Sequence, residues 1–326
     1  MKLITIIYKS LIALRNYLYD INVFSSYRAT LPVISVGNIT VGGTGKTPFV
    51  IYISNFLKEK NINPLILTRG YKRSSRKQIH ITENSAPRLL DIGDEAALLH
   101  ESCKGVDILV NKNRVKAVKW VEQNYSKYDC IILDDGFQHR SLKRDCNIAL
   151  ISPSQDMSSY PPKGKLREPF KNIVRADAVV FTKTTPSLSL KQEIEKLNIP
   201  IYNAVFNFSI SKPVEINDNH HFLVFCGIGN PAFFFKSLSS LGVHIKHSLT
   251  FQDHQNYSDR IISLIINKMK KNNIRKFITT KKDWVKLPKY LLTKYDGCFL
   301  DMSVTASEDN LGDLDFKKFF LKSIKK

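Results

Sequence analysis

The sequence predicts an α/β protein with a mostly parallel, helix-covered sheet and a smaller second α/β unit. Two observations predict the sheet. Apolar stretches typical of strands alternate with helix-like stretches from residue 33 to residue 182, and a glycine-rich loop follows the first strand. The alternation changes near residue 201 and resumes in a shorter form, which predicts the second unit. A chain of 326 residues is long enough for two domains.

The first 24 residues predict an amphipathic helix. Apolar side chains recur at spacings of three and four and so share one face; they are Leu3, Ile7, Leu11, Leu14, Leu18 and Ile21. Such a helix could lie in a membrane interface, with Lys2 and Lys9 towards the headgroups. It could also pack its apolar face against the rest of the protein. The helix residues leave both interpretations open, and the basic charge of the chain favours the first.

A phosphate-binding loop is predicted at residues 40–47, after a buried strand that begins at Val33. Its members are Thr40, Val41, Gly42, Gly43, Thr44, Gly45, Lys46 and Thr47. In such a loop backbone N–H groups surround phosphate oxygens, the lysine reaches the outer phosphates and the last threonine faces Mg²⁺. The strict pattern has glycine where this chain has Thr40. The alternative is a glycine-rich turn with a chance Gly-Lys-Thr, and the order of strand, loop and lysine favours the phosphate loop.

Charged residues follow the next predicted elements. A helix over 49–60 and a strand over 64–68 lead to Arg69, which could meet an anion because ligand contacts gather at strand ends in α/β sheets. A solvated surface arginine is the alternative. Asp94 and Glu95 open a helical stretch, and the helix dipole alone accounts for acidic residues there.

A second motif ends the strand predicted over 128–133. Asp134 and Asp135 follow it directly, which is a Walker B arrangement. Such an aspartate holds Mg²⁺, directly or through water, opposite the loop threonine. Adjacent acids at a strand end also form turns. The pairing with a phosphate loop favours the metal site.

The later part of the chain predicts fewer functional residues. Strands are predicted over 147–151, 177–181, 201–208, 222–226 and 277–279, with helices beginning near Pro231 and ending near residue 270. His254 lies beside Asp253 and could take part in acid–base chemistry. The spacing of His244, His247 and His254 fits no usual zinc site.

The composition limits the possible partners. A net charge of +20 and a pI near 9.6 suggest an anionic partner, which could be nucleic acid, an acidic membrane surface or a phosphorylated substrate. The five cysteines are scattered, which argues against a disulfide framework and fits a reducing cytosol. No apolar run is long enough to span a bilayer, and no signal-peptide cleavage pattern is visible.

Together these motifs resemble one family over residues 32–257, the tetraacyldisaccharide 4'-kinases, which are the lipid A 4'-kinases of Gram-negative bacteria. The resemblance rests on the phosphate loop, Thr68-Arg-Gly-Tyr71, Gly93-Asp-Glu95, Asn113-Arg114, Leu133-Asp-Asp-Gly-Phe-Gln-His139, Gly164-Lys-Leu-Arg-Glu-Pro169, Gly227-Ile-Gly-Asn-Pro231 and Asp253-His254. The Asp-Asp-Gly-Phe-Gln-His and Leu-Arg-Glu-Pro blocks are the specific part. This chain has Gln255 where the family often has a second histidine.

The resemblance implies a lipid kinase that moves the γ-phosphate of ATP to the 4'-hydroxyl of tetraacyldisaccharide 1-phosphate, giving lipid IVA. It implies a P-loop kinase with a smaller second domain joined by a β-ribbon. The domains would be a membrane-associating helix at 1–24, a nucleotide-binding domain at 25–205 and a C-terminal domain at 206–326, whose last segment could pack back on the first domain. The partners would be the lipid A precursor and an anionic membrane surface, at the cytoplasmic face of the bacterial inner membrane.

The resemblance also implies roles for single residues. Lys46 would hold the ATP phosphates, with Arg69 and Arg114 nearby. Thr47, Asp134 and Asp135 would serve the Mg²⁺ site. Asp94 would be the general base on the sugar hydroxyl, tuned by His254. His139 and Arg167 would be substrate or structural contacts.

Two other functions could use the same loop. A nucleic-acid-stimulated P-loop ATPase would explain the charge, but the sequence has no recognised nucleic-acid module, so no nucleic-acid partner is expected. A nucleotide-dependent metal or protein chaperone would be expected to carry a cysteine or histidine cluster, which is absent from the sequence.

Overall fold

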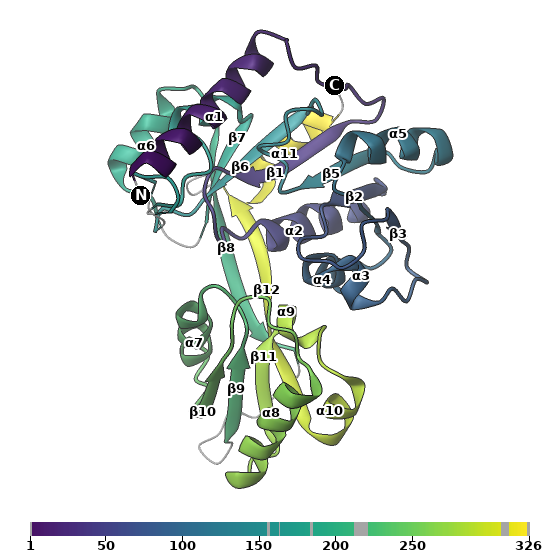
Figure 1. Ribbon diagram of the computed structural model, residues 1–326, viewed down its shortest axis with the longest axis vertical. Helices are drawn as coiled ribbons and strands as arrows, with labels where there is room; N and C mark the ends of the chain where they lie inside the picture. Colours follow the sequence, from purple (N-terminus) through teal and green to yellow (C-terminus); the bar gives the residue numbers. More distant parts are fainter. Residues whose placement is uncertain are drawn as a thin grey trace.

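The computed structural model describes residues 2–154, 157–162, 164–182, 185–211, 221–307 and 313–324, and has two lobes joined by a narrow ribbon (Figure 1). Within these residues one sheet of 12 strands runs through both lobes in the order β10-β9-β11-β12-β8-β7-β6-β1-β5-β2-β4-β3. Every neighbouring pair is parallel except β8 with β12 and β3 with β4. The predicted α/β class and mostly parallel sheet are confirmed.

The larger lobe is built on seven strands of this sheet. They are β1 (Val33–Asn38), β2 (Pro64–Thr68), β3 (Ile79–Ile81), β4 (Asp107–Val110), β5 (Cys130–Asp134), β6 (Cys146–Ile151) and β7 (Ala178–Thr182). β1 lies at the centre, between β5 and β6. Its residues are all buried, as are those of β5, because helices cover both faces of the sheet.

Two layers of helices bury the faces of the larger lobe. The helices are α2 (Lys46–Glu59), α3 (Leu89–Ile92), α4 (Asp94–Ser102), α5 (Arg114–Asn124) and α6 (Leu188–Glu195), with the 3₁₀ helix η1 (Phe170–Arg175). α2 and α4 contribute Phe49 and Leu99 to one core cluster, whereas α5 contributes Val118 to another. Helices α2, α5 and α6 follow strands β1, β4 and β7 and return over the sheet, so loops at the carboxyl ends of the parallel strands meet at one edge.

The smaller lobe repeats this layered arrangement. Its strands are β9 (Phe222–Cys226), β10 (Ile245–Thr250) and β11 (Lys276–Thr280), and its helices are α7 (Pro231–Ser240), α8 (Asp259–Lys271), α9 (Lys281–Trp284) and α10 (Lys289–Lys294). The Asn230 side chain caps α7 by accepting from the Phe233 N–H, and Pro231 occupies its first turn. The helix predicted near Pro231 therefore begins where expected.

Two long antiparallel strands connect the lobes. β8 (Ile201–Ile210) lies parallel to β7 at its start and then pairs with β12 (Asp296–Ser307). β12 in turn lies beside β11 in the smaller lobe. The domain boundary predicted after residue 205 falls inside β8.

The last helix lies against the larger lobe. α11 (Asp313–Ile324) follows β12, and its Phe316 ring contacts the rings of Phe49 in α2 and Tyr202 in β8. Phe316 and Phe320 are fully buried. The chain thus crosses the ribbon twice, and its end contributes to the core under the phosphate loop helix.

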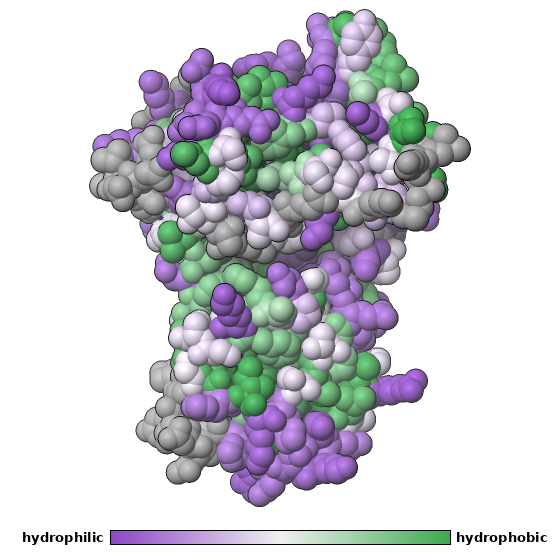
Figure 2. Space-filling view, turned by 90° about the vertical axis from the view of Figure 1, so that its left-hand side faces the viewer, coloured by the Kyte–Doolittle hydropathy of each residue, from purple (hydrophilic) through white to green (hydrophobic). Residues whose placement is uncertain are grey.

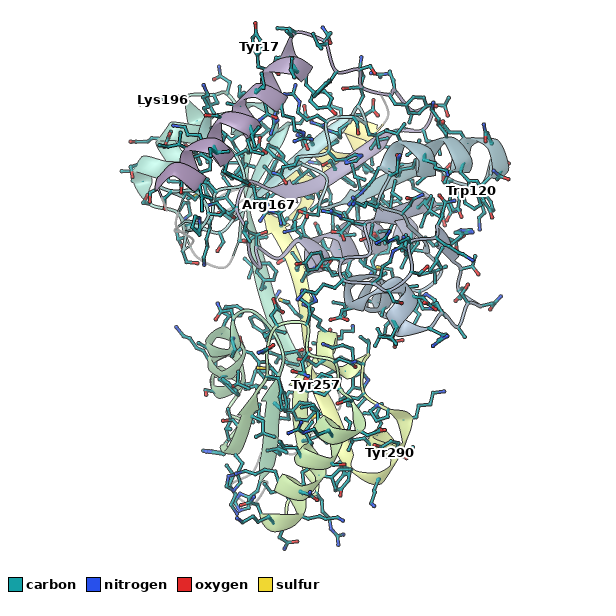
Figure 3. The ribbon with its side chains drawn as sticks, viewed as in Figure 1. Tyr17, Trp120, Arg167, Lys196, Tyr257 and Tyr290 are labelled. Atoms are coloured by element: carbon teal, nitrogen blue, oxygen red, sulfur yellow. The ribbon has the colours of Figure 1, made fainter. Side chains whose placement is uncertain are left out.

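The first helix, α1 (Lys2–Asp20), packs on the larger lobe with its polar side. Its apolar side chains point away from the body and are 50–61% exposed at Ile4, Ile7, Leu11 and Leu14; the side chain of Leu3 lies outside the described residues, and Leu18 is half-buried. Tyr17 also points outwards (Figure 3). Among the helices described, none is long and apolar enough to cross a membrane.

Candidate active site

The predicted phosphate loop connects β1 to the N-terminus of α2. Gly45 has a φ of 88° at the position before α2, a conformation that glycine adopts without strain. The Asn38 side chain, at the end of β1, donates to the Thr44 hydroxyl at 3.0 Å. Thr40 forms a bridge with Leu166, and the Val41 N–H donates to the Lys165 carbonyl at 2.6 Å. The loop is therefore held open against the segment 165–168.

Lys46 and Asp135 face each other across this loop. The Lys46 Nζ lies 3.3 Å from Asn38 Oδ1 and 3.5 Å from Asp135 Oδ1. The Arg167 guanidinium donates to both Asp135 oxygens, at 2.8 and 2.9 Å. Burial raises the pKa of Asp135, but these two cations outweigh it and hold the pKa below its ordinary value.

Asp134 is buried beside this pair. It accepts a hydrogen bond from the Thr68 hydroxyl at 3.1 Å, and its backbone carbonyl accepts from Arg114 Nη2 at 3.0 Å. Burial, and after it the charge of Asp135, raises the pKa of Asp134. Arg114 is only 4% exposed, and its guanidinium therefore holds the end of β5 from inside the protein. Arg69 is exposed at the end of β2.

Glu95 belongs to the same acidic group, and no role for it followed from the sequence. Burial, and next the charge of Asp134, raises its pKa to about 7; Lys282 and Lys46 act in the opposite direction. Glu95 thus responds to charges from both lobes. The only feature of the sequence that pointed to Glu95 was its position next to Asp94. The helix dipole explains two acidic residues at a helix start equally well.

Asp94 is the point where the smaller lobe contacts this site. Its Oδ2 lies 3.2 Å from His254 Nδ1 and 3.4 Å from Lys286 Nζ. Asp94 begins α4 in the larger lobe, whereas His254 and Lys286 belong to the smaller lobe. The Tyr71 ring packs edge-on against the His254 ring at 5.3 Å. The predicted pairing of Asp94 with His254 therefore exists in the folded chain.

Two lysines, Lys286 and Lys282, bring positive charge close to the Asp94–His254 pair. Lys286 is 2% exposed in its side chain, lies 2.8 Å from the buried Asp283 and sits over the Tyr257 ring; Figure 3 shows Tyr257 in the smaller lobe, near the ribbon. Lys282 Nζ lies 3.4 Å from His254 Nε2. Burial, followed by the charge of Lys282, lowers the pKa of His254. The imidazole is therefore neutral at pH 7.

A cavity of about 600 Å³ lies next to the loop, on the side that carries α6 and α7. Phe206, Phe208 and Phe233 line it together with Lys191 and Thr185. Figure 2 looks at this side and shows hydrophobic residues gathered at the waist between the lobes. Phe206 also covers Gly45, where an added Cβ would lie 2.6 Å from the ring. One wall residue of the cavity, Phe206, therefore contacts the phosphate loop.

The oxygen ligands at this edge fit a magnesium ion. β5 ends at Asp134 and Asp135 follows it, whereas Thr47 lies in the first turn of α2, which follows the neighbouring strand β1. Mg²⁺ is usually held by one or two carboxylates together with water and substrate phosphates. In the part of the chain that the structure describes, no three histidine, cysteine, aspartate or glutamate side chains form a ready-made metal cage. This donor set fits an ion that arrives with a nucleotide.

A glycine-rich loop with Lys46 and Thr47, an acidic strand end opposite it and an Asp–His pair at the same edge define a P-loop kinase. The family model described as "Tetraacyldisaccharide-1-P 4'-kinase" matches residues 1–321. The chain belongs to this family.

Individual relatives agree with this assignment. The chain is 33% identical to a tetraacyldisaccharide 4'-kinase of Chlorobaculum parvum, covering 86% of this chain and 82% of the relative. It is 34% identical to that of Aquifex aeolicus, covering 87% and 88%. The solved "apo" form of the Aquifex aeolicus enzyme LpxK, in complex with ATP, superposes with a TM-score of 0.80 and 31% identity, covering 98% of this chain and 97% of that one.

These comparisons confirm the resemblance and the enzyme class that the motifs predicted. They support the tetraacyldisaccharide 4'-kinase rather than the nucleic-acid-stimulated ATPase.

Proposed function

We propose that this chain transfers the γ-phosphate of ATP to the 4'-hydroxyl of tetraacyldisaccharide 1-phosphate at an anionic membrane surface, the cytoplasmic face of the bacterial inner membrane. The observation that carries this proposal is the Asp94–His254 contact between the lobes, at the same edge as Lys46 and the acidic pair. A nucleotide-binding loop alone would fit any ATPase. A carboxylate–imidazole pair facing it supplies a base for a hydroxyl acceptor.

The larger lobe supplies the nucleotide side of the reaction. Backbone N–H groups of residues 40–47 surround the phosphates, and Lys46 neutralises charge on the transferred group, with Arg69 adding a cation at the strand end. Thr47, Asp134 and Asp135 would hold Mg²⁺, and the ion would supply charge neutralisation of the phosphate oxygens. The cavity takes the nucleoside part of ATP, because its wall residue Phe206 covers Gly45 of the loop and Phe208 and Phe233 add further aromatic walls.

Asp94 acts on the acceptor. Its carboxylate takes the proton of the 4'-hydroxyl while the hydroxyl oxygen bonds to the γ-phosphorus, and the bond from that phosphorus to the bridging oxygen of ADP breaks. Neutral His254 donates from Nδ1 to Asp94 Oδ2 and orients the carboxylate. Lys286 contacts the same oxygen and fixes the other side of Asp94.

The outward face of α1 contacts the membrane in this proposal. We define that face as Ile4, Ile7, Leu11, Leu14 and Tyr17 together with Ile21, which directly follows the helix; all of them are 48–61% exposed. Exposed apolar side chains in a row along one helix are unusual on a protein surrounded by water and are typical of an interfacial helix. The acceptor is a lipid, so a membrane contact would bring the site to its substrate.

A kinase assay tests the reaction. Purified protein with Mg·ATP and the acceptor in detergent is expected to give the 4'-phosphorylated product. Lys46→Ala should abolish turnover, and Asp94→Ala should lower kcat by about 10²–10⁴-fold while ATP binding is kept, because the base acts on the acceptor. Absence of product from the wild-type protein would refute the function, and loss of ATP binding in Asp94→Ala would move Asp94 to the nucleotide.

Vesicle flotation tests the membrane contact. A deletion of α1 would also remove its polar contacts to the body, so we substitute three outward residues, Ile7→Ser, Leu11→Ser and Leu14→Ser. We expect flotation with anionic vesicles to be lost. The exposed Ser10→Ala is the matched control on the same helix. Equal flotation of the triple variant and the wild type would remove the membrane role of the outward face.

A further inference from the structure

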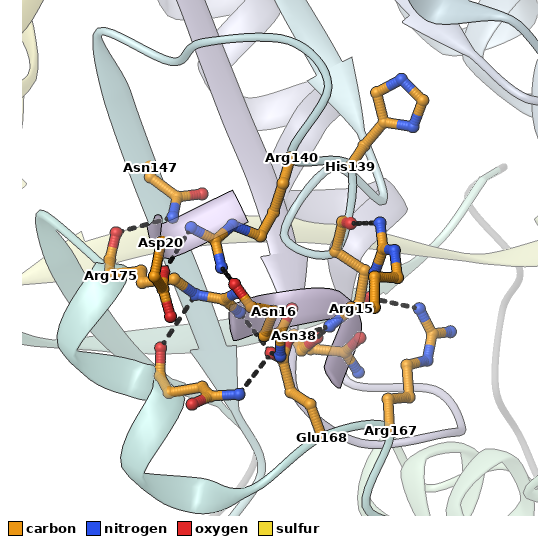
Figure 4. A network of polar contacts seen from close by, with 12 residues as sticks. Arg15, Asn16, Asp20, Asn38, His139, Arg140, Asn147, Arg167, Glu168 and Arg175 are labelled. Carbon is orange, nitrogen blue, oxygen red and sulfur yellow. Dashed lines mark hydrogen bonds and ion pairs between the residues drawn. The ribbon is translucent and has the colours of Figure 1, made fainter. Parts of the chain in front are cut away.

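The polar side of α1 contacts the two segments that support the phosphate loop. We call this side the docking face and define it as Tyr8, Arg15, Asn16 and Asp20. Arg15 Nη2 donates to the Gln138 carbonyl at 2.7 Å, and the Tyr8 hydroxyl donates to the Arg167 carbonyl at 3.0 Å. Figure 4 shows Arg15, Asn16 and Asp20 of this face in one network of polar contacts with Arg140 and Glu168. The docking face is therefore bound to the strand-end loop after β5 and to the segment 165–168.

Both segments continue into the phosphate site. The Gln138 side chain donates to the Asn38 carbonyl at 2.7 Å, and the Asn38 side-chain oxygen lies 3.3 Å from Lys46 Nζ. Arg167 donates to both oxygens of Asp135 and also to Gln138 Oε1 at 3.2 Å. The path from Arg15 to Lys46 therefore consists of three hydrogen bonds of 2.7–3.3 Å. Gln138 and Asn38 each take part in two of them, one through the backbone carbonyl and one through the side chain.

A buried carboxylate joins the two segments to each other. Glu168 is 1% exposed and accepts from Gln138 Nε2 at 2.8 Å and from Asn16 Nδ2 at 3.3 Å. It also pairs with Arg175 of η1. Arg140 donates to the Asn16 carbonyl and to Asp20, which attaches α1 a second time to the loop after β5. A buried network of this kind has one low-energy arrangement, so displacement of α1 would change it as a whole.

We propose that α1, besides contacting the membrane, positions the phosphate site, and that Arg15 is the positioning residue that acts through Gln138 on Asn38 and Lys46. This inference rests on the proposed kinase function. The two faces of α1 then have separate tasks. The outward face decides where the enzyme resides, and the docking face decides how well it holds Mg·ATP.

Substitutions on the two faces separate these tasks. Arg15→Ala removes the donor to the Gln138 carbonyl, and Tyr8→Phe removes one hydroxyl with no change of shape. Because a hydrogen bond from a charged group is at stake, we expect Arg15→Ala to weaken Mg·ATP binding by about tenfold. Tyr8→Phe should weaken it less, and Arg15→Lys, which keeps one donor, should restore most of it. Ser10→Ala, at an exposed position outside the docking face, is the control.

The measurement is calorimetric binding of a non-hydrolysable Mg·ATP analogue in detergent, together with KM for each substrate and flotation with anionic vesicles. We expect the docking-face variants to lose nucleotide affinity and to keep both flotation and KM for the acceptor. The outward triple variant should do the reverse, losing flotation and keeping the nucleotide affinity. Nucleotide binding needs no acceptor, so this result stands or fails separately from the kinase assay.

Three outcomes would overturn the inference. Wild-type nucleotide affinity in both Arg15→Ala and Tyr8→Phe would show that docking does not reach the phosphate site. A raised KM for the acceptor alone would assign Arg15 to the lipid. If Arg15→Lys did not restore nucleotide affinity, the hydrogen bond from residue 15 to the Gln138 carbonyl would not be the cause of the loss. If Arg15→Ala lowers the melting temperature, Tyr8→Phe with unchanged melting tests whether docking of α1 reaches the phosphate site through the Arg167 segment.

Discussion

The residues of the candidate site differ in how far the sequence could predict them. Lys46, Thr47, Asp134 and Asp135 belong to contiguous motifs in which spacing alone determines the local geometry. The role of Asp94 followed only from the family resemblance, because two acids at a helix start have an ordinary electrostatic explanation. Lys286 and Lys282 had no signal at all, since surface lysines are common and only folding brings these two to His254.

The pH dependence of transfer is expected to report His254. A protonated imidazole would pair with Asp94 and stabilise its negative charge, which makes proton transfer to the carboxylate less favourable. We therefore expect kcat to decrease on acidification with a midpoint at a pH lower than 6.5, the ordinary pKa of histidine, because burial and the charge of Lys282 lower the pKa of His254.

Lys282→Ala tests this assignment. The substitution removes a positive charge 3.4 Å from Nε2, so the pKa of His254 rises and the acid limb should move to higher pH. The check is a pH–rate profile between about pH 5 and 8, with the exposed Lys289→Ala as control. A limb that stays in place or moves to lower pH would contradict the role of His254.

Gly37 is expected to be needed for packing behind the phosphate loop. A Cβ at this position would lie 2.5 Å from the Phe137 backbone nitrogen, which cannot move without displacing the acidic strand end. Gly37→Ala should lower the free energy of unfolding by about 1–3 kcal/mol and weaken Mg·ATP binding. At Gly229 the nearest atom is the movable carboxylate of Asp253, so Gly229→Ala is the control. If Gly37→Ala kept the urea midpoint and the Mg·ATP affinity of the wild type, Gly37 would not be needed for this packing.

Among the elements, α1 and α11 show what periodicity leaves undecided. The apolar spacing of α1 predicted a helix, and α1 forms. The same spacing could not say which face would meet the body, and the polar face does, through Arg15 and Asn16. α11 lies in the part of the chain where the sequence offered no motif, yet Phe316 and Phe320 are fully buried. Burial of a terminal helix depends on the surface left free by distant elements.

Phe316→Ala tests how much α11 contributes to the larger lobe. The ring is fully buried and contacts Phe49 and Tyr202, so its removal leaves a cavity between α2, β8 and α11. We expect a loss of about 3–5 kcal/mol in the free energy of unfolding. Lys318→Ala on the exposed side of α11 should change it by less than about 0.5 kcal/mol. Urea denaturation measures both, and equal midpoints would show that α11 is not part of this core.

The molecule as a whole joins two lobes through one sheet. The ribbon of β8 and β12 places the smaller lobe so that His254 meets Asp94 across 160 residues of chain. The net charge of +20 is also a property of the whole molecule, because its field attracts anionic partners at a distance and not through a single site. Among the anionic partners that the charge left open, the family membership favours the lipid precursor.

Salt and lipid composition should therefore control membrane binding. We expect stronger flotation with anionic than with zwitterionic vesicles. Raising the salt to about 1 M, where charges are screened beyond roughly 3 Å, should remove most of that difference. Residual binding at high salt would come from the outward face of α1 and should vanish in its triple variant. Binding that ignores both salt and lipid charge would contradict an electrostatic contribution.

The sequence by itself determined the α/β class, the phosphate loop, the acidic strand end and most strands of the larger lobe. These features depend on local spacing, and local spacing records which side of an element is buried. The family resemblance implied the pairing of Asp94 with His254 and a last segment that packs back on the first domain. The tertiary structure alone decided the contact of Asp94 with Lys286, the acidic environment of Glu95 and the side of α1 that meets the body. Each of these depends on strand order and on packing between segments far apart in the chain, which no local pattern encodes.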